Sequence, residues 1–359
     1  LDEAQDMTSC QADLFWGPGQ RNGKIIYLFG DKYQQIYRWR GASNSFRDVV
    51  DASNPKLTLT GSFRFGKNIA SCATAVLKAL GGETLHGRST SPGLVEKFAP
   101  QCGHSEMDKC VVLCRTRIGC FAHLYANAPH HWCYLGGESE PPRHPKQYEY
   151  DLEVFVHRLK DKEGKAAEEG EGGSDNCGSG NGGETFFTYK GESFLTLEDI
   201  EEYIDDEGDI ELHRSLRLLQ FLVPRGKSID DFYSDLKASF YPMQEHESPD
   251  NYRGTIIDTV HKAKGLEFNC PVVISDDFRF GAIKSAVVNS YRHCDEANIL
   301  YVAITRAKQH LYLAEGAHSC LDYLSKLDHV KVELPPMFSL DSSQAKFSRW
   351  QEAWSRFKE

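Results

Sequence analysis

The fold of this chain is best indicated by Thr255-Ile256-Ile257-Asp258-Thr259-Val260-His261-Lys262-Ala263-Lys264-Gly265-Leu266-Glu267-Phe268. The stretch begins as a short apolar run and continues into small, hydroxylated and basic residues. This order is typical of a buried parallel strand with functional groups after its carboxyl end. Similar apolar runs occur at 24–29, 111–114, 272–275 and 311–313. Helical patterns lie between them, at 68–80 and 297–308, so the sequence predicts an α/β fold with a parallel sheet.

The middle of the chain interrupts this alternation. Residues 164–184 are rich in Gly, Glu and Ser, and we expect a flexible loop there because such a segment cannot bury an apolar core. Helical patterns follow at 197–204, 210–221 and 228–238. Together they predict a small helical subdomain inserted into the α/β pattern.

The negative charge of the chain is concentrated in one segment. The total net charge is −11, and residues 161–211 hold 17 acidic and three basic residues, a net charge of −14. The remaining residues therefore carry −11 less −14, or +3. This distribution is compatible with a basic groove for nucleic acid, and we interpret the acidic segment as a solvated insertion.

The composition is that of a globular protein. The 359 residues give room for about two domains, and no apolar run approaches the ~18 residues of a membrane span, so we expect no membrane partner. The eleven cysteines are scattered without a Cys-X-X-Cys pair, which does not indicate a disulfide framework. Cys120, His123, His130, His131 and Cys133 match no common zinc-ligand spacing, and we expect ordinary packing there.

The chain opens with paired carboxylates in Leu1-Asp2-Glu3-Ala4-Gln5-Asp6. Many nucleotide hydrolases carry such a motif at the end of an apolar strand. Asp2 would then hold Mg²⁺, usually through water, and Glu3 would orient the attacking water and accept its proton. A Gly-rich phosphate loop should precede this motif, so we interpret the sequence as a piece of a larger motor.

A second block, Gly30-Asp31-Lys32-Tyr33-Gln34-Gln35-Ile36-Tyr37-Arg38-Trp39-Arg40-Gly41-Ala42, follows a predicted strand. A carboxamide at a strand end, here Gln34, can hydrogen-bond both a phosphate oxygen and a water. Tyr37, Trp39 and Arg40 combine two stackable rings with a guanidinium, which suits the unstacked bases of single-stranded nucleic acid. For Tyr37 alone, core packing is a credible alternative.

Two arginines stand in further blocks. Arg64 lies in Leu57-Thr58-Leu59-Thr60-Gly61-Ser62-Phe63-Arg64-Phe65-Gly66, and Arg306 lies in a helical pattern between two predicted strands. Taken alone, Arg64 would be a surface arginine, whereas a guanidinium at the place of Arg306 can neutralise charge that develops on a γ-phosphate. In the opening stretch, Thr259, His261 and the two neighbouring lysines can approach a phosphate backbone.

In this order, the blocks resemble motifs II to VI of superfamily 1 helicases of the UvrD/Rep type. The chain is thus similar to a helicase fragment that starts at motif II. The variants Gln34-Gln35-Ile36-Tyr37, Ser62-Phe63-Arg64-Phe65-Gly66 and 259–268 resemble those of the F-box DNA helicase family. The resemblance covers about residues 1–315 and is weakest at 138–250. It implies an α/β fold of P-loop NTPase (RecA-like) domains with parallel sheets, the first truncated and the second carrying a small helical insertion.

The resemblance also implies ATP and Mg²⁺ as cofactors and a role for each matching residue. The implied catalytic residues are Asp2 for the metal, Glu3 as base, Gln34 as γ-phosphate sensor, and Arg64 and Arg306 as paired arginine fingers. Nucleotide contacts are implied for Gln5, Gly265 and Glu267. DNA contacts are implied for the bases at Tyr37, Trp39 and Arg40, and for the backbone at Thr259 and His261.

Domain boundaries can be set from the same resemblance. The expected parts are a remnant of RecA-like domain 1A at 1–60, domain 2A at 61–145 and 250–328, a 2B-like helical insertion with a disordered Gly/Glu-rich loop at 146–249, and a tail at 329–359. In the tail, the spacing of Phe347, Trp350, Trp354 and Phe357 predicts one amphipathic helix.

The resemblance implies a nuclear, eukaryotic DNA helicase that moves 3′ to 5′ along single-stranded DNA and acts in repair and recombination. We expect little ATPase activity from this chain alone, because it lacks the phosphate loop and the adenine-recognition segment. An F-box, which would recruit a ubiquitin-ligase scaffold, is also missing from the sequence. One alternative is a non-catalytic paralogue that binds single-stranded DNA or a protein. Another is a bacterial-type repair helicase or helicase–nuclease subunit, and an RNA-directed role fits the motifs less well.

Overall fold

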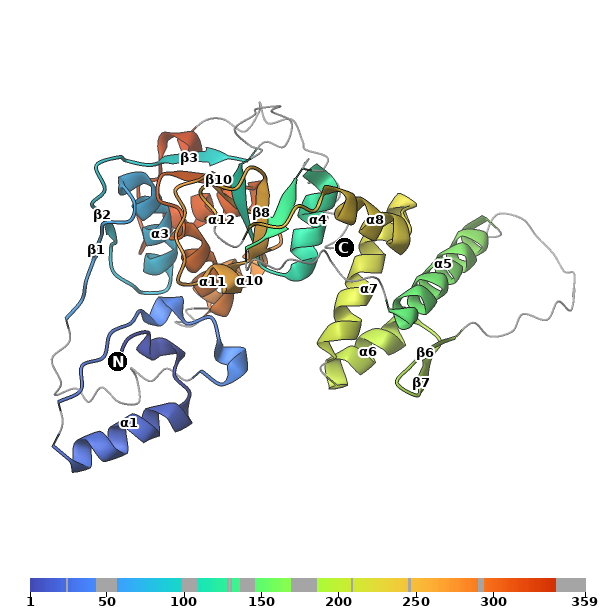
Figure 1. The fold of residues 1–359 in the computed structure, drawn as a ribbon, viewed down its shortest axis with the longest axis horizontal. Helices are drawn as coiled ribbons and strands as arrows, with labels where there is room; N and C mark the ends of the chain where they lie inside the picture. The colour runs from blue at the N-terminus through green and yellow to red at the C-terminus, as the bar shows by residue number, and fades with distance from the viewer. Residues whose placement is uncertain are drawn as a thin grey trace, which may run out of the picture. The chain divides into compact units, whose positions relative to one another are not determined.

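A six-stranded sheet forms the core of the fold, and every neighbouring pair of its strands is parallel (Figure 1). The strand order is β3 (Leu94–Lys97), β10 (His310–Leu313), β9 (Val272–Ile274), β4 (Cys110–Cys114), β8 (Thr255–Thr259) and β5 (Trp132–Tyr134). Every residue of β4, β5 and β9 is buried, as expected for strands covered on both faces. The predicted α/β fold with a parallel sheet is therefore confirmed.

The structure, a computed structural model, describes residues 1–23, 25–42, 57–98, 109–127, 129, 131–135, 146–168, 186–207, 209–244, 247–289 and 294–339. The chain divides into two units. The first unit contains the sheet and comprises residues 1–123, 129–138 and 241–348. The second unit comprises residues 124–128, 139–240 and 349–359.

Helices pack around the sheet and on one another. They are α3 (Lys67–Ala79), α4 (Arg117–Asn127), α9 (Val260–Ala263), α10 (Phe280–Val288), α11 (Asp295–Ile304) and α12 (Glu315–Ser325), followed by the short η6 (Pro336–Ser339). α3 contacts both α11 and α12, and α10 contacts the same two helices. A separate pair of short parallel strands, β1 (Gly61–Ser62) and β2 (His86–Gly87), precedes and follows α3.

The predicted helices at 68–80 and 297–308 correspond to α3 and α11, and the second ends earlier than predicted. α11 stops at Ile304 because the next residues pair with Phe268. The Phe268 amide donates to the Arg306 carbonyl at 3.0 Å, and the Lys308 amide donates to the Phe268 carbonyl at 3.0 Å. Arg306 therefore lies in the turn after the helix, and not on the helix as predicted.

The N-terminal segment, drawn in dark blue in Figure 1, is built from short elements. These are η1 (Ala4–Asp6), α1 (Ser9–Arg21), η2 (Lys32–Gln34) and η3 (Arg38–Arg40). The predicted buried strand at 24–29 is wrong for its described part, 25–29. Ile25, Tyr27 and Phe29 are 81%, 69% and 57% exposed. Among the described residues, the backbone of this run bonds to Leu1 and Ala4, and its large side chains at 25, 27 and 29 stay in solvent.

The second unit is mainly helical. Its elements are α5 (Gln147–Glu168), β6 (Phe187–Tyr189), β7 (Glu192–Phe194), α6 (Leu197–Glu207), α7 (Ile210–Leu222), η5 (Val223–Arg225) and α8 (Ile229–Ser239). β6 and β7 form an antiparallel hairpin. The ring of Tyr125 packs edge-on against Phe221, with centroids 5.4 Å apart, inside the core of this unit.

The three helices predicted in this region are confirmed as α6, α7 and α8. The predicted loop at 164–184 begins too early, because α5 continues to Glu168. The rest of that loop, and the predicted tail helix around Trp350 and Trp354, lie outside the described residues. Among the helices that the structure describes, none combines the length and apolar character needed to cross a membrane.

Candidate functional site

Asp2 and Glu3 are exposed at the start of the turn η1. Glu3 has a left-handed backbone conformation with φ of 51°, which is uncommon for a residue other than glycine. Its carboxylate accepts a hydrogen bond from the side chain of Gln5, and the Asp2 carboxylate accepts from the Glu3 amide at 2.9 Å. Gln5 is buried and also accepts from the Asp31 amide at 3.1 Å. The turn is thereby fixed to the block that begins at Gly30.

The two carboxylates fit a magnesium ion better than a transition metal. Within the described ranges, no group of three or more His, Cys, Asp and Glu residues is placed to hold a metal. Mg²⁺ does not need such a group, because it usually binds through one or two carboxylates and completes its shell with water and substrate phosphate oxygens. Asp2, which is exposed, could supply one such carboxylate.

Arg64 and Arg306 meet beside Glu267. The Arg64 Nε forms an ion pair with the Glu267 carboxylate at 2.6 Å, and a terminal nitrogen donates to the Thr305 carbonyl at 3.1 Å. Lys308 pairs with the same carboxylate at 2.7 Å. Hydrogen bonds from Lys308 and then Arg64 are the main causes that hold the pKa of Glu267 below its usual range. The carboxylate therefore stays ionised and holds both cations.

Arg306 is held more rigidly than Arg64. Its side chain is buried, with 2% of the residue exposed. Its Nε donates to the Val302 carbonyl at 3.0 Å, and its terminal nitrogens donate to the Leu266 carbonyl at 2.9 Å and the Thr305 hydroxyl at 3.2 Å. All three nitrogens are thus used to fix the guanidinium in one orientation.

The electrostatic surroundings of Arg306 reach across to the N-terminal turn. The pKa of Arg306 is lowered to about 10, first by burial and then by the positive charge of Arg64. The charges of Glu3 and Glu267 act in the opposite direction and raise it. Arg306 is therefore still cationic at neutral pH.

The two adjacent glutamines have different surroundings. The Gln34 side chain is half-buried and donates to the Asp31 carboxylate at 3.1 Å. The Gln35 side chain is buried and donates to the Gln5 carbonyl at 2.9 Å. Gln35 therefore ties this block to the carboxylate turn, which leaves Gln34 as the carboxamide that can meet a ligand. Sequence reasoning assigned no structural role to Gln35.

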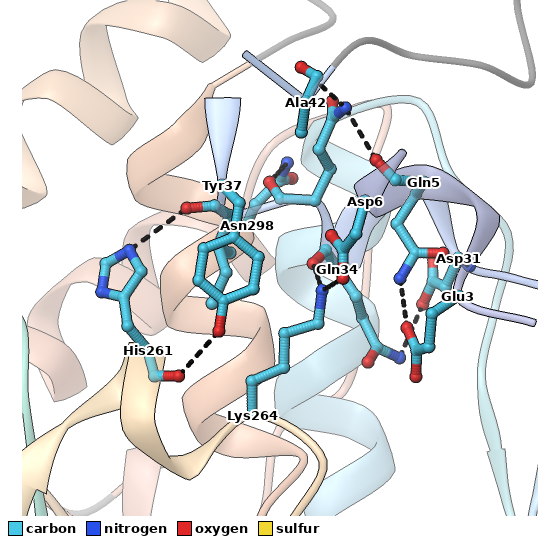
Figure 2. Close-up of polar contacts among 12 residues, drawn as sticks. Glu3, Gln5, Asp6, Asp31, Gln34, Tyr37, Ala42, His261, Lys264 and Asn298 are labelled. Atoms are coloured by element: carbon cyan, nitrogen blue, oxygen red, sulfur yellow. Dashed lines mark hydrogen bonds and ion pairs between the residues drawn. The ribbon is translucent and has the colours of Figure 1, made fainter. Parts of the chain in front are cut away.

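Three consecutive backbone carbonyls, at residues 34, 35 and 36, accept hydrogen bonds from side chains of α9, of its C-cap residue and of α11 (Figure 2). Lys264 Nζ donates to the first at 2.8 Å, and Asn298 Nδ2 donates to the second at 3.0 Å. His261 Nε2 lies 3.2 Å from the third. We refer to these oxygens as the carbonyl row. Because a carbonyl only accepts, His261 must carry its proton on Nε2 in this arrangement.

The aromatic residues after the carbonyl row surround His261. The Tyr37 hydroxyl donates to the His261 carbonyl at 2.9 Å, so part of Tyr37 is structural. The Arg40 guanidinium lies over the Trp39 ring, 4.6 Å from its centroid, and Trp39 is 67% exposed. Burial lowers the pKa of His261, so the imidazole is neutral at pH 7. An exposed ring backed by a cation can stack with an unpaired base.

Thr259 and Gly265 lie at the two ends of the segment that carries His261. Thr259 ends β8, is half-buried, and donates its amide to the Asp258 carboxylate at 2.7 Å. Gly265 has φ of 85°, a conformation that favours glycine, and a Cβ there would meet no atom within 4 Å. The turn at Gly265 directs the chain towards Leu266 and Glu267, both of which contact the arginine pair.

One segment imitates a phosphate loop in sequence but not in structure. Residues 61–68 read Gly-Ser-Phe-Arg-Phe-Gly-Lys-Asn, with Asn68 where a phosphate loop has Ser or Thr. The backbone amide of Asn68 donates to the Pro92 carbonyl at 2.9 Å, so this N–H is not directed at a ligand. A Cβ on Gly66 would lie 1.8 Å from the Ser91 carbonyl oxygen, because this backbone packs directly on the loop.

Lys264 is the main residue whose role the sequence did not indicate. From the sequence it is one of two lysines able to approach a phosphate backbone. The structure instead turns it inward, where its side chain is 7% exposed and forms an ion pair with Asp6. Residues 6 and 264 are far apart in the chain, so no local pattern could have revealed this pair.

Comparisons with known proteins agree with the geometry. Residues 1–51 match the family model of the UvrD/REP helicase N-terminal domain, and residues 211–316 match that of the UvrD-like helicase C-terminal domain. F-box DNA helicase protein 1 of Schizosaccharomyces pombe is 27% identical over 348 residues, covering 87% of this chain and 33% of the relative. F-box DNA helicase 1 of Gallus gallus is 30% identical over 347 residues, covering 89% and 29%.

A probable DNA helicase II homolog of Mycoplasma pneumoniae is 37% identical over 102 residues, which cover 27% of this chain and 14% of the relative. The chain spans about a third of the length of the two F-box DNA helicases that it matches over most of its own residues.

Proposed function

Residues 1–51 and 211–316 belong to the UvrD-type helicase families, as the motifs predicted, and from this premise we propose that the chain works in an ATP-dependent DNA helicase. The observation that carries the proposal is the position of Arg306. This guanidinium and that of Arg64 both donate to Thr305, to its hydroxyl at 3.2 Å and to its carbonyl at 3.1 Å respectively. Two guanidinium groups in the unit that also holds the carboxylate turn suit a γ-phosphate bound among them.

Each candidate residue has a role in this proposal. Asp2 would hold Mg²⁺, and Glu3 would orient and deprotonate the attacking water. Gln34 would contact the γ-phosphate, with Arg64 and Arg306 stabilising the charge that develops on it. Gln5 holds Glu3 in place, while Gly265 and Glu267 shape the arginine side of the nucleotide site.

The nucleic-acid side of the proposal rests on the aromatic group around His261. Trp39, exposed and backed by Arg40, would stack with a base, and Tyr37 would support that contact. Thr259 and the neutral His261 would contact the sugar–phosphate backbone. We propose single-stranded DNA as the ligand and 3′-to-5′ movement along it.

A biological setting can be proposed from the relatives' names. Two of them are F-box DNA helicases, of Schizosaccharomyces pombe and Gallus gallus. On that likeness we propose a nuclear role for this protein in DNA repair and recombination.

The test is phosphate release by the full-length protein that carries this chain, with and without single-stranded DNA. We expect DNA to stimulate ATP hydrolysis, and we expect strand separation from duplexes with a 3′ single-stranded tail but not with a 5′ tail. Arg64→Ala should lose the stimulated activity by about 10³-fold. A full-length protein that releases phosphate at the same rate with and without DNA would contradict the proposal.

For the 359-residue chain by itself we propose DNA binding with little hydrolysis. The one Gly-X-X-X-X-Gly-Lys spacing in the candidate site, at residues 61–67, is packed against residues 91–92 and does not form a phosphate cradle. Measuring phosphate release and the fluorescence anisotropy of labelled oligothymidylate on this chain tests the idea. Robust DNA-stimulated turnover by the isolated chain would overturn it.

A further inference from the structure

Lys264 contacts three parts of the N-terminal segment through one ammonium group. Its Nζ forms an ion pair with Asp6 and donates to the Gln34 carbonyl at 2.8 Å. It also lies 5.1 Å from the centroid of the Tyr37 ring, within the range of a cation–π contact. Figure 2 shows the lysine side chain reaching these partners from the segment that carries His261.

The ion pair is largely shielded from solvent. The side chains of Lys264 and Asp6 are 7% and 22% exposed. Burial is the largest influence on Asp6 and raises its pKa, whereas the bond from Lys264 lowers it. Within the described residues, the buried Oδ1 of Asp6 has no hydrogen-bond partner. The charge of Asp6 therefore depends on Lys264, and removing the lysine alone would leave a buried carboxylate uncompensated.

The partners of Lys264 belong to the two turns that carry the proposed hydrolysis groups. Asp6 is the last residue of η1, which follows Glu3 and contains Gln5. Gln34 is the last residue of η2 and belongs to the carbonyl row. On its other side, Lys264 is three residues from His261, whose carbonyl is bonded to Tyr37.

We propose that Lys264 is a positioning residue that couples DNA contact to ATP hydrolysis, an inference that rests on the function proposed above. DNA bound at Tyr37 and His261 shifts the segment 261–264. The ammonium transmits this shift to Asp6 and to the Gln34 carbonyl, and so moves Glu3 and Gln34 relative to the triphosphate. Lys264 itself touches neither DNA nor nucleotide.

The other contacts to the N-terminal segment are less suited to this role. Asn298 and His261 donate to the carbonyl row without a full charge, because burial holds the His261 imidazole neutral at pH 7. Arg38 and Asp295 form an ion pair, but their side chains are 52% and 44% exposed, so water and salt weaken it. Lys264 alone among these contacts combines a full charge with burial.

The test compares Lys264→Met with Lys284→Met in the full-length protein. Lys284 is a matched control. It lies on α10, its ammonium is 5.1 Å from the centroid of the Tyr323 ring on α12, and it takes no part in the site. ATP hydrolysis is measured against single-stranded DNA concentration. For Lys264→Met we expect the maximal DNA-stimulated rate to fall about tenfold, with a smaller change in the DNA concentration for half-stimulation. Lys264→Arg should recover part of the rate, and Lys284→Met should match the wild type.

A second measurement does not depend on activity. Amide hydrogen exchange at residues 32–42, without nucleotide or DNA, should be faster in Lys264→Met than in the wild type or Lys284→Met. Asp6→Asn combined with Lys264→Met leaves no unpaired buried charge. We expect this double variant to fold normally and to remain uncoupled to the same extent as Lys264→Met alone.

The outcomes separate this inference from the proposed function. A wild type with no DNA-stimulated hydrolysis overturns both. A wild type that is stimulated normally, with Lys264→Met indistinguishable from Lys284→Met in stimulation and in exchange, overturns only the role of Lys264. If Lys264→Met does not fold, the double variant carries the same comparison.

Discussion

Arg64 and Arg306 both lie near the carboxylate of Glu267, but the stability of the fold depends on them to different extents. Arg306 is 2% exposed and its three nitrogens serve three acceptors, whereas the Arg64 side chain is 28% exposed and pairs with Glu267. Truncating a buried, fully bonded side chain removes packing and leaves its acceptors unsatisfied. The two residues should therefore separate stability from catalysis.

We expect Arg306→Ala to lower the free energy of unfolding by about 3 kcal/mol, because it creates a cavity and removes the donor that the Leu266 carbonyl has in Arg306. Arg64→Ala should lower it by about 1 kcal/mol or less. Both should reduce DNA-stimulated ATP hydrolysis in the full-length protein. Urea unfolding and phosphate release measure the two effects, and an equal loss of stability in both variants would contradict this account.

His123 gives the stability of the first unit a dependence on pH. It is buried beside Phe98, with ring centroids 5.5 Å apart, and burial lowers its pKa from 6.5 to about 4. Below pH 6.5 the unfolded chain binds a proton that the folded chain does not, so stability is lost as the pH falls from 6.5 towards 4. A shift of about 2.5 units corresponds to about 3 kcal/mol, since one unit is about 1.4 kcal/mol.

We therefore expect the midpoint temperature of thermal unfolding to decrease as the pH is lowered from 7 to 4.5. The decrease should be smaller in His123→Gln. His318, whose pKa burial also lowers to about 4, should act in the same direction. The double variant His123→Gln/His318→Gln should then show the shallowest dependence. Identical pH profiles for the wild type and both variants would rule out these histidines as the cause.

At the scale of elements, the loop between β1 and α3 depends on close backbone packing. A Cβ on Gly66 would lie 1.8 Å from the Ser91 carbonyl oxygen and 2.7 Å from the Pro92 Cα, so the backbone would have to move. Because Arg64 stands in this loop, such a movement would also displace its guanidinium from Glu267.

We expect Gly66→Ala to destabilise the first unit by about 3 kcal/mol or more and to reduce DNA-stimulated hydrolysis. Gly281→Ala is the control, because Gly281 lies in α10 and a Cβ there would meet nothing within 4 Å. That substitution should be neutral or stabilising by up to about 1 kcal/mol, from helix propensity. Thermal unfolding of both variants provides the comparison, and a stable Gly66→Ala would show that the loop can relax.

The sequence predicted some elements well because their patterns are local. α7 shows helical spacing and ends at Leu222, just before the turn Pro224-Arg225-Gly226, where Gly226 has φ of 63°. α1 could not be predicted, because Gly17-Pro18-Gly19 argues against a helix and the structure forms one nevertheless. β5 is a three-residue strand that is recognisable only from its pairing with β8.

In the site, too, the sequence indicated the residues of local motifs but not the contacts between residues far apart in the chain. The order of the motifs brought Arg64, Arg306 and the opening carboxylates into one hypothesis. It could not show that Lys264 faces Asp6, because the contact joins residues that are 258 positions apart in the sequence. Nor could it show that Asn298 and His261 hydrogen-bond to backbone carbonyls, because every residue has a carbonyl and the sequence does not indicate which ones accept.

At the scale of the whole molecule, the chain has two units, each with its own apolar core. Leu219 in α7 and Ile257 in β8 are fully buried in the second and first units. We expect Leu219→Ala and Ile257→Ala each to cost about 3 kcal/mol in the unit that holds the residue. Amide hydrogen exchange resolved by peptide tests this. The idea fails if either variant accelerates exchange equally throughout both units.

The carbonyl row has a consequence for how this protein tolerates change during evolution. Peptide oxygens are the same whatever side chain a residue carries, so the three hydrogen bonds to the carbonyl row do not by themselves restrict the side chains at positions 34–36, provided that the backbone keeps its path. The three donors have no such freedom, since each must supply a nitrogen at a fixed reach. Orthologues should therefore keep a nitrogen donor at 261, 264 and 298, whereas at Ile36, which is 2% exposed, only burial should limit the residue to an apolar one.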